Sequence, residues 1–428
     1  MQLIMNGILD KISLGNLWLF SLFGWLGTSL STLGGIMLVL LTAVRAPVFW
    51  RDMRHQPLFW YSIVLISFFL GHYVILRYQQ PLAVPPDLDV LEGFILLCFF
   101  SVIAWVLKGK SLSLVRSVLV LAAIGLLASF VLHIDWADIA SFFEKRQSFG
   151  KAAIAQGLYA GLVLFGFFVF LASLLDLVGN RKWKKIVAIA FWLIGVIVAA
   201  TAFLATQSRG AWGAFIVAII VAFFGAMVHC PHALYTNGKR LALPLILGAI
   251  FMVGLVVYYQ EAIFDRLLQD SSVYEQLITV DRESIPYSSV GRRAHMWIYG
   301  IQCWMERPML GWGVGSAQPL LKQDPNLAIH PHFHNTYIQI LVETGLVGLL
   351  LFCGLVLLLL FSLCNSFKKG NIPLDIFIFL IGAWVMVLTW SLIDTRLIHY
   401  DGRFLWLLLM GVTMVVSQGW LRRKSKSA

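Results

Sequence analysis

Residues 336–362, TYIQILVETGLVGLLLFCGLVLLLLFS, form a long apolar run in which Glu343 is the only charged residue. A helix needs about 20 apolar residues to cross the hydrocarbon core of a bilayer, so this run predicts a membrane span. The composition of the whole chain agrees. Of its 428 residues, 60% are hydrophobic and 12% are charged, whereas a soluble domain has about 25% charged residues. The sequence therefore predicts an all-α polytopic membrane protein.

The same criterion, applied along the chain, predicts about twelve transmembrane helices. They lie at 12–28, 29–45, 57–76, 91–107, 117–134, 152–176, 186–205, 210–228, 241–259, 336–362, 372–390 and 403–421. The first two are short, and we expect them to form a tight hairpin.

Lysine and arginine are concentrated in every second loop between these spans. One set of loops holds 19 basic and 4 acidic residues, and the other set holds the remaining 13 basic and 17 acidic residues. Because basic loops stay in the cytoplasm, this asymmetry predicts an even number of spans with both termini on the cytoplasmic side. The net charge of +11 belongs to loops beside spans, so we expect no nucleic-acid partner.

The chain divides into three predicted regions. These are 1–259 with transmembrane helices one to nine, 260–335 as one large helical loop on the outer side, and 336–428 with the last three transmembrane helices and a basic cytoplasmic tail. Apolar residues at helical spacing predict two helices in the loop, at 261–277 and near 290–306, the second capped by Ser288 or Ser289. The glycines of GWGVGS, which follow, are expected to form turns.

The first candidate anion ligand is Arg209, in the stretch QSRGAW at 207–212. It stands between two apolar segments with almost no loop, where an arginine is costly unless it has a partner. It either binds an anion at the membrane surface or extends toward lipid headgroups.

The second candidate is the pair Arg292 and Arg293, in SSVGRRAHMW. Both fall in the first turn of a predicted helix, where free N–H groups and the helix dipole already attract anions. Cations are unfavourable there for stability, which suggests that an anion is bound. The alternative is that the pair binds Asp281 or Glu283.

Three histidines alternate in HPHFH, just before the apolar run. If the segment is extended, His330, His332 and His334 share one face. This spacing invites a zinc site, but zinc needs a fourth ligand and a second shell, and we expect no metal. The stretch could also be a solvated polar lip. The third interpretation is a general base, because the imidazole pKa lies near the working pH. His334, beside the span, is favoured for that role.

Charged residues inside or next to the predicted spans are few. Near span ends, or flanking the last outer loop, stand Asp176, Glu343, Asp394, Arg396, Asp401 and Arg403. A proton-coupled transporter usually keeps carboxylates in the middle of its spans, so this distribution argues against transport.

Four motifs, taken in order, resemble the O-antigen ligase family. His334-Asn335, followed after nine residues by Gly345-Leu346-Val347-Gly348, resembles the H-[N/S/Q]-x9-G-x-x-G signature of that family. QSRGAW is similar to its arginine at the start of a span. SVGRRAHMW is similar to its S-x-G-x-R-x-x-x-W element, which aligns Arg293, and RPMLGWGVGS is similar to its P-x-x-G-x-G run. The motifs cover about residues 200–350.

The resemblance implies a GT-C-like glycosyltransferase of the Gram-negative inner membrane with a periplasmic active site. Such ligases move a glycan from undecaprenyl diphosphate onto a sugar of the lipid A–core. These two lipids and the surrounding membrane lipids are therefore the expected partners, with no cofactor and no metal. The implied roles are a general base for His334, diphosphate binding for Arg209 and Arg293, and substrate binding for Arg292, Asn335, His332 and His330. Gly345 and Gly348 would allow close packing of the span.

Two other enzymes and one transporter remain as alternatives. O-antigen polymerases and protein O-oligosaccharyltransferases use the same lipid-linked donor and carry related motifs. A lipid-linked glycan transporter would also be a basic protein with twelve spans, but it would need a polar path through the membrane.

Overall fold

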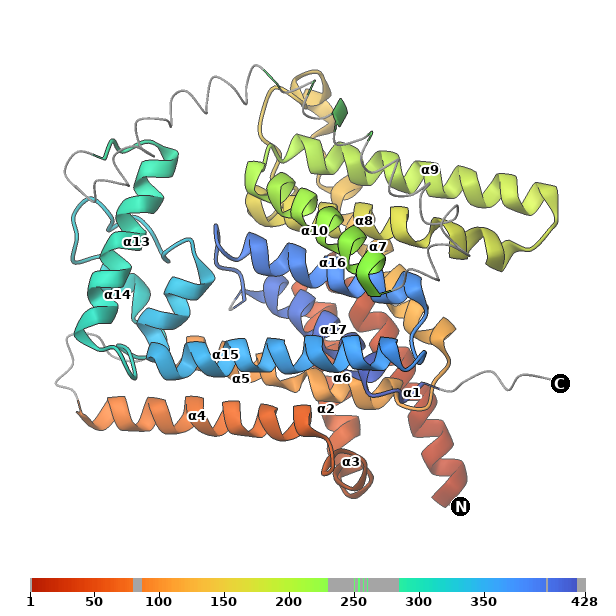
Figure 1. The fold of residues 1–428 in the computed structure, drawn as a ribbon, viewed down its shortest axis with the longest axis horizontal. Coiled ribbons are helices and arrows are strands. Elements are labelled where there is room, and N and C mark those ends of the chain that lie inside the picture. The colour runs from red at the N-terminus through yellow and green to blue at the C-terminus, as the bar shows by residue number, and fades with distance from the viewer. Residues whose placement is uncertain are drawn as a thin grey trace.

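The computed structural model describes residues 2–79, 87–229, 285–397 and 399–421, together with positions 250, 253, 254, 257 and 260. These residues form helices, turns and loops, with no strand among them. The predicted all-α class is therefore confirmed for the described part of the chain. Figure 1 shows long helices that run in roughly one direction, with α13 and α14 across one end of the bundle.

The helices before the large loop are α1 (Gln2–Phe23), α2 (Thr28–Val44), α3 (Ala46–Met53), α4 (Pro57–Gln79), α5 (Leu88–Leu96), η1 (Leu97–Phe99), α6 (Phe100–Leu107), α7 (Leu112–Leu132), η2 (Trp136–Ser141), α8 (Ala153–Val178), α9 (Lys182–Ala205) and α10 (Arg209–His229). The helices after it are α13 (Ser289–Glu306), α14 (Ala317–Leu321), α15 (Thr336–Lys368), α16 (Leu374–Trp390) and α17 (Tyr400–Ser417).

A helical segment lies at every predicted span except 241–259, most of which is outside the described residues. The described residues do not show twelve full spans. In the described part of the chain, seven helices are long and apolar enough to cross a membrane, or eight if the bent pair α2–α3 is counted as one span. Helix α16 and the apolar part of α10, Arg209–Ala222, are shorter than a full crossing. The protein is a multi-pass helical membrane protein, and a count of twelve stays a prediction.

The N-terminal hairpin has the form expected from its sequence. Helices α1 and α2 are joined by a short turn, and the backbone of Gly34 approaches Phe20 so closely that an added Cβ would lie 3.4 Å from it. The bundle core is built from aromatic residues of later helices. Trp384 of α16 is fully buried, stands edge-on to Trp406 of α17, and donates a 3.0 Å hydrogen bond to Thr413.

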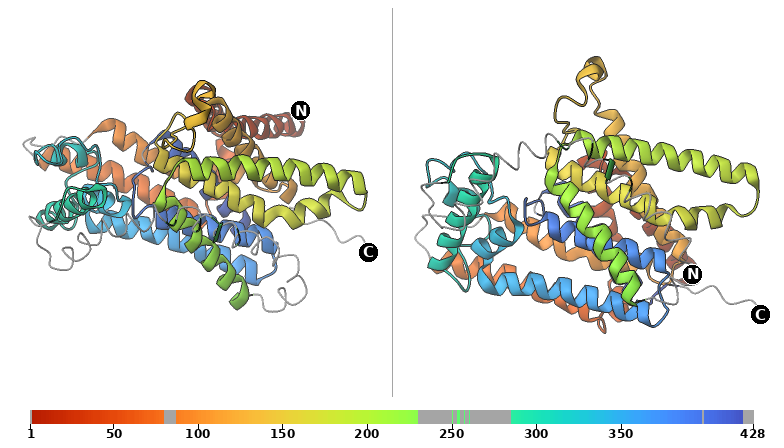
Figure 2. Two further views of the ribbon diagram at one scale, coloured as in Figure 1. Left: turned by 90° about the horizontal axis from the view of Figure 1, so that it is seen from above. Right: turned by 45° about the horizontal axis from the view of Figure 1, so that its top comes forward.

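A cap at one end of the bundle is a small layer built on α13 and α14. Ser288 caps α13 by accepting a 3.1 Å hydrogen bond from the amide of Gly291, which confirms the helix predicted near 290–306. The cap has its own buried apolar cluster, separate from the bundle core. Its members include Met296, Cys303, Leu320, Leu321, Phe333 and Val342. The other predicted helix, 261–277, lies outside the described residues. In Figure 2 the cap covers the same end of the bundle from two further directions.

The basic loops meet at the opposite end. Arg45 pairs with Asp10 at 2.5 Å, and the Gly109 amide donates to the Trp420 carbonyl at 2.9 Å. Near them Lys108 pairs with Asp52 at 3.1 Å. The basic tail after Leu421 lies outside the described residues. This gathering agrees with the predicted charge asymmetry, while the orientation in the membrane and the three-region division stay predictions.

Candidate active site

His334 stands one residue before the cap of α15, in a strained backbone conformation. Asn335 is the N-cap, and its side-chain oxygen accepts hydrogen bonds from the amides of Tyr337 at 3.0 Å and Ile338 at 3.1 Å. His334 itself has φ +49°, which is uncommon for a residue other than glycine. Such a conformation persists only where the surrounding structure enforces it.

Both flanks of His334 are anchored to other elements. The Trp297 indole of α13 donates a 3.1 Å hydrogen bond to the carbonyl of Phe333. On the other side the Thr336 hydroxyl donates to the Asp394 carbonyl at 2.9 Å, and the Thr336 amide donates to the Ser391 carbonyl at 2.8 Å. These contacts join the start of α15 to α13 and to the α16–α17 loop, so they fix the position of the imidazole.

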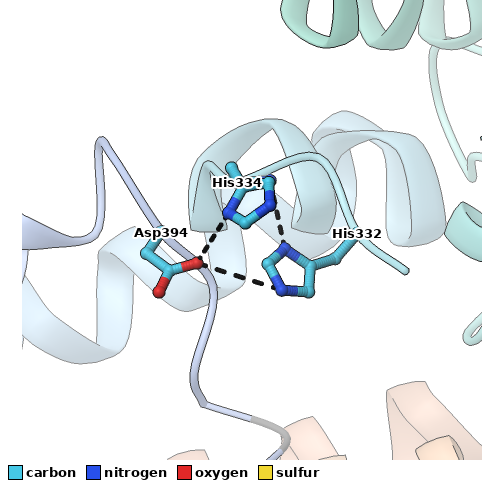
Figure 3. A group of neighbouring side chains, drawn as sticks. All are labelled: His332, His334 and Asp394. Atoms are coloured by element: carbon cyan, nitrogen blue, oxygen red, sulfur yellow. Dashed lines mark hydrogen bonds and ion pairs between the residues drawn. The ribbon is translucent and has the colours of Figure 1, made fainter. Parts of the chain in front are cut away.

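The imidazole of His334 is paired with a buried carboxylate. Nδ1 of His334 lies 3.0 Å from Oδ1 of Asp394, and the side chain of Asp394 is 4% exposed whereas that of His334 is 22% exposed. Figure 3 shows both imidazoles turned toward this carboxylate. Burial opposes ionisation of Asp394, but the hydrogen bond from His334 and the neighbouring imidazoles outweigh it, and the net result lowers its pKa.

The pairing decides which nitrogen of His334 carries the proton. An ionised carboxylate can only accept a hydrogen bond, so Nδ1 of His334 is the protonated nitrogen. Nε2 then keeps its lone pair and can accept a proton. A carboxylate that orients a histidine in this way is the arrangement found where the histidine acts as a general base.

His332 is held as a neutral neighbour. Its Nδ1 accepts a 3.2 Å hydrogen bond from the amide of His334, and its Nε2 lies 3.9 Å from Asp394. Burial, followed by the positive charge that His334 carries once it is protonated, lowers the pKa of His332 to about 3, and Asp394 opposes this in part. The ring of His330 stands 5.9 Å from that of His334, and its pKa is lowered by burial, by His334 and by Arg292.

Arg209 and Arg293 come to the same place from separate helices. Arg209 is the first residue of α10, and Arg293 lies near the N-terminus of α13. Burial lowers the pKa of Arg293, the Asp394 carboxylate raises it, and the charge of Arg209 lowers it. The three side chains are thus close enough for their charges to interact. Arg292, beside them, is exposed.

The structure therefore brings all seven predicted site residues to one end of the bundle, although their roles stay predictions. Asn335 has a structural task, because its side-chain oxygen caps α15. Asp394 is the residue to which the sequence alone assigns no role. Its position in the loop between α16 and α17 is visible in the sequence, but its contact with His334, 60 positions earlier, depends on the packing of α15 against α16 and α17.

The signature glycine Gly345 breaks α15. It has φ +66° and ψ −169°, and an added Cβ would lie 2.2 Å from the carbonyl oxygen of Met309. The segment 308–313 enters this break. The amide of Trp312 donates to the carbonyl of Val342 at 2.8 Å, and the amide of Leu346 donates to the carbonyl of Pro308 at 2.9 Å. The backbone of segment 308–313 therefore supplies hydrogen-bond partners at the break, and only a glycine at 345 leaves room for it. This explains why the glycine and the P-x-x-G-x-G run occur together.

Three side chains of the site could also hold a metal ion. His332, His334 and Asp394 each offer one ligand atom, and these atoms lie within 4.8 Å of one another. A metal ligated by Nδ1 of His334 would replace the proton that this nitrogen shares with Asp394. The metal and general-base interpretations thus use the same atoms, and an experiment must separate them.

The family model of the O-antigen ligases matches residues 194–353. The match runs from α9 through α10, α13 and α14 into the first half of α15, so it includes the two arginines, the histidines and Gly345 but not Asp394. A search of curated proteins found no match to the chain.

Proposed function

From the premise that residues 194–353 form a domain of the O-antigen ligase family, whose members transfer lipid-linked glycans, we propose that this protein is an O-antigen ligase. It transfers a glycan from undecaprenyl diphosphate to a sugar of the lipid A–core. The reaction takes place on the periplasmic face of the Gram-negative inner membrane, with both termini in the cytoplasm. The observation that carries the proposal is the 3.0 Å contact between Asp394 and His334, beside Arg209 and Arg293.

In the proposed reaction His334 acts on the acceptor. Its Nε2 takes the proton from an acceptor hydroxyl as that oxygen attacks C1 of the donor glycan. Nδ1–H stays on Asp394, whose charge stabilises the imidazolium that forms. The new C1–O bond forms on the face opposite the departing phosphate oxygen, so a single displacement inverts the configuration at C1.

The arginines act on the leaving group. As the C1–O bond to the diphosphate breaks, negative charge develops on its oxygens. Arg209 and Arg293 supply preorganised positive charge there, and the planar guanidinium groups match phosphate oxygens in pairs. Arg292, which is exposed, adds positive charge beside them. Charge supplied in this way lets the transfer proceed without a metal.

The test is complementation of a strain that lacks this protein. We would express wild type, His334→Ala and, as a matched control, His55→Ala, which changes an exposed histidine at the basic end. Lipopolysaccharide would be separated on a gel, and lipid-linked glycans would be measured in parallel. For a ligase, the strain with His334→Ala shows bare core and long glycan on undecaprenyl diphosphate, and His55→Ala restores the ladder.

Two other outcomes would overturn the proposal. Core capped with single repeat units in the strain lacking the protein would indicate a polymerase. A normal ladder with His334→Ala would mean that this histidine belongs to a polar lip or to a transporter.

A further inference from the structure

A second group of basic side chains lies next to the proposed catalytic pair. Arg396 follows Asp394 by two residues in the α16–α17 loop, and Lys151 precedes α8. Burial lowers the pKa of Lys151, the Asp401 carboxylate raises it, and the charge of Arg396 lowers it. The geometry agrees, because the Lys151 ammonium group lies over the Trp25 ring, whose centroid is 4.4 Å from that of Tyr159, and Tyr159 lines the same cavity as Arg396, 245 positions from Lys151 in the sequence. The donor site proposed above uses neither of them.

Arg396 is incompletely paired. Its Nε is buried and has no hydrogen-bond partner among the described residues. The side chain lines a small cavity between α8, α16 and α17, together with Tyr159 and Ser391. The remaining wall is apolar and consists mainly of Leu158, Val387, Trp390, Leu405, Trp406 and Leu409. A buried guanidinium N–H without a partner is costly, so this position favours a ligand that brings an acceptor atom.

Tyr159 points to the same ligand chemistry. It is 1% exposed, and its hydroxyl faces the Asp401 carboxylate without completing an ordinary hydrogen bond to a described residue. It lines the cavity beside Arg396. A tyrosine hydroxyl in this position can donate a hydrogen bond to an oxyanion.

Lys151 is held in place rather than left to solvent. Its ammonium group donates a 3.1 Å hydrogen bond to the carbonyl of Trp25 and lies 5.0 Å from the centre of the Trp25 ring. Arg396 adds a second positive charge near Lys151, and Arg403 adds a third beside His399, against the two carboxylates of Asp401 and Asp394. The excess of positive charge favours an anion.

This second group is supplied by different elements from the first. Arg209 and Arg293 come from α10 and α13, whereas Lys151 and Arg396 come from the segment before α8 and from the α16–α17 loop. The two groups meet around the histidines, because the charge of Arg396 also lowers the pKa of His332. A donor diphosphate held by the first pair leaves the second pair for the other substrate.

We propose that Lys151 and Arg396, with Tyr159, form a second anion site that binds a phosphate group of the acceptor glycolipid. The inference rests on the proposed transfer to a lipid acceptor. Binding there would hold the acceptor beside the α16–α17 loop, with its nucleophilic hydroxyl directed to His334. The site would thus select phosphorylated acceptors and leave donor binding unchanged.

The test uses the full-length protein in phosphatidylcholine vesicles, with undecaprenyl diphosphate–linked glycan as donor. The acceptor is lipid A–core, either intact or chemically dephosphorylated. For Arg396→Gln and Lys151→Gln, we expect the KM for intact acceptor to rise about tenfold or more, with an unchanged KM for the donor. With dephosphorylated acceptor, wild type and variants should have the same high KM. Arg396→Lys, which keeps the charge, should restore part of the loss.

Lys322→Gln is the matched control, because Lys322 is exposed in the cap away from this cavity. It should transfer glycan like wild type. An unchanged acceptor KM in both Gln variants would overturn the site while leaving the ligase function intact. Absence of transfer by wild type would instead contradict the function itself. If inorganic phosphate competes strongly while dephosphorylation of the acceptor has no effect, the site binds free phosphate and the proposal is wrong. If Arg396→Gln does not fold, Lys151→Gln carries the same test.

Discussion

Oδ1 of Asp394 lies 3.0 Å from Nδ1 of His334, and this contact joins the α16–α17 loop to the start of α15. Asp394→Asn would replace an acceptor-only group by an amide that can donate to Nδ1, which favours the wrong tautomer of His334. We expect the rate of glycan transfer to fall about 10²–10⁴-fold, with an unchanged KM for the donor. Initial rates in proteoliposomes measure both quantities. A variant that keeps half of the wild-type rate would remove Asp394 from the mechanism.

Arg209→Lys and Arg293→Lys should each be poorly tolerated. Lysine keeps the charge but loses the planar fork that matches phosphate oxygens. We expect kcat/KM for the donor to fall about 10–100-fold in each variant, the effect of losing one hydrogen bond to a charged group. Arg181→Lys, an exposed arginine between α8 and α9, is the control and should behave as wild type. Normal transfer by both site variants would contradict the diphosphate role.

Glycan transfer should continue in the presence of EDTA. The proposed mechanism places a proton between His334 and Asp394, and it takes positive charge for the leaving group from arginines. The rate should therefore equal that of untreated protein after dialysis against the chelator. Loss of activity that one particular metal restores would assign His332, His334 and Asp394 to a metal centre.

His332 should make the folded protein sensitive to mild acid. Its pKa is about 3 in the folded state, against an ordinary value of 6.5. As the pH falls through 6.5, the unfolded chain gains a proton that the folded protein does not bind, so stability decreases until about pH 3. At pH 5.5 the loss from this residue is about 1.4 kcal/mol.

Thermal unfolding of the detergent-solubilised protein at pH 7.5 and 5.5 measures this effect. The wild-type midpoint should drop more between the two pH values than that of His332→Asn, which lacks the titrating ring. Equal drops in both proteins would show that His332 is not kept neutral by the fold.

Gly345→Ala should destabilise the protein. The new Cβ would meet the carbonyl of Met309, and φ +66° is unfavourable for alanine. We expect a cost of about 1–3 kcal/mol. Gly71→Ala is the matched control, because Gly71 lies inside helix α4 with open space around its Cβ position. That change should be neutral or should stabilise the helix by up to about 1 kcal/mol. If both substitutions change the unfolding midpoint by the same amount, the break at Gly345 has no special role in stability.

The sequence was sufficient for elements that depend on local pattern. Apolar runs mark the positions of the helices. The serine before SVGRR marks the start of α13, because an N-cap side chain bonds only to amides of the residues that directly follow it. The histidines and Arg293 are recognisable for the same reason, since each motif is contiguous. The count of full spans is harder to predict, because α16 has a single charged residue yet is only 17 residues long.

Features that depend on tertiary packing could not be predicted. The role of Asp394 requires a contact across 60 positions. The grouping of Lys151 with Arg396 requires α8 to pack against α16 and α17. The break in α15 depends on a contact between distant segments, because the hydrogen bonds missing at Gly345 are supplied by the segment 308–313.

The break at Gly345 also lets one segment of the cap hold α15 on both of its sides. The segment Thr336–Thr344, which follows His334, is tied by hydrogen bonds to the cap and to the α16–α17 loop. Beyond the break, the amides of Leu346 and Val347 donate to the carbonyls of Pro308 and Met309. A long span answers a change in bilayer thickness by tilting. Because the cap is bound to α15 on both sides of Gly345, a tilt of this helix would carry the cap and His334 with it as one rigid unit.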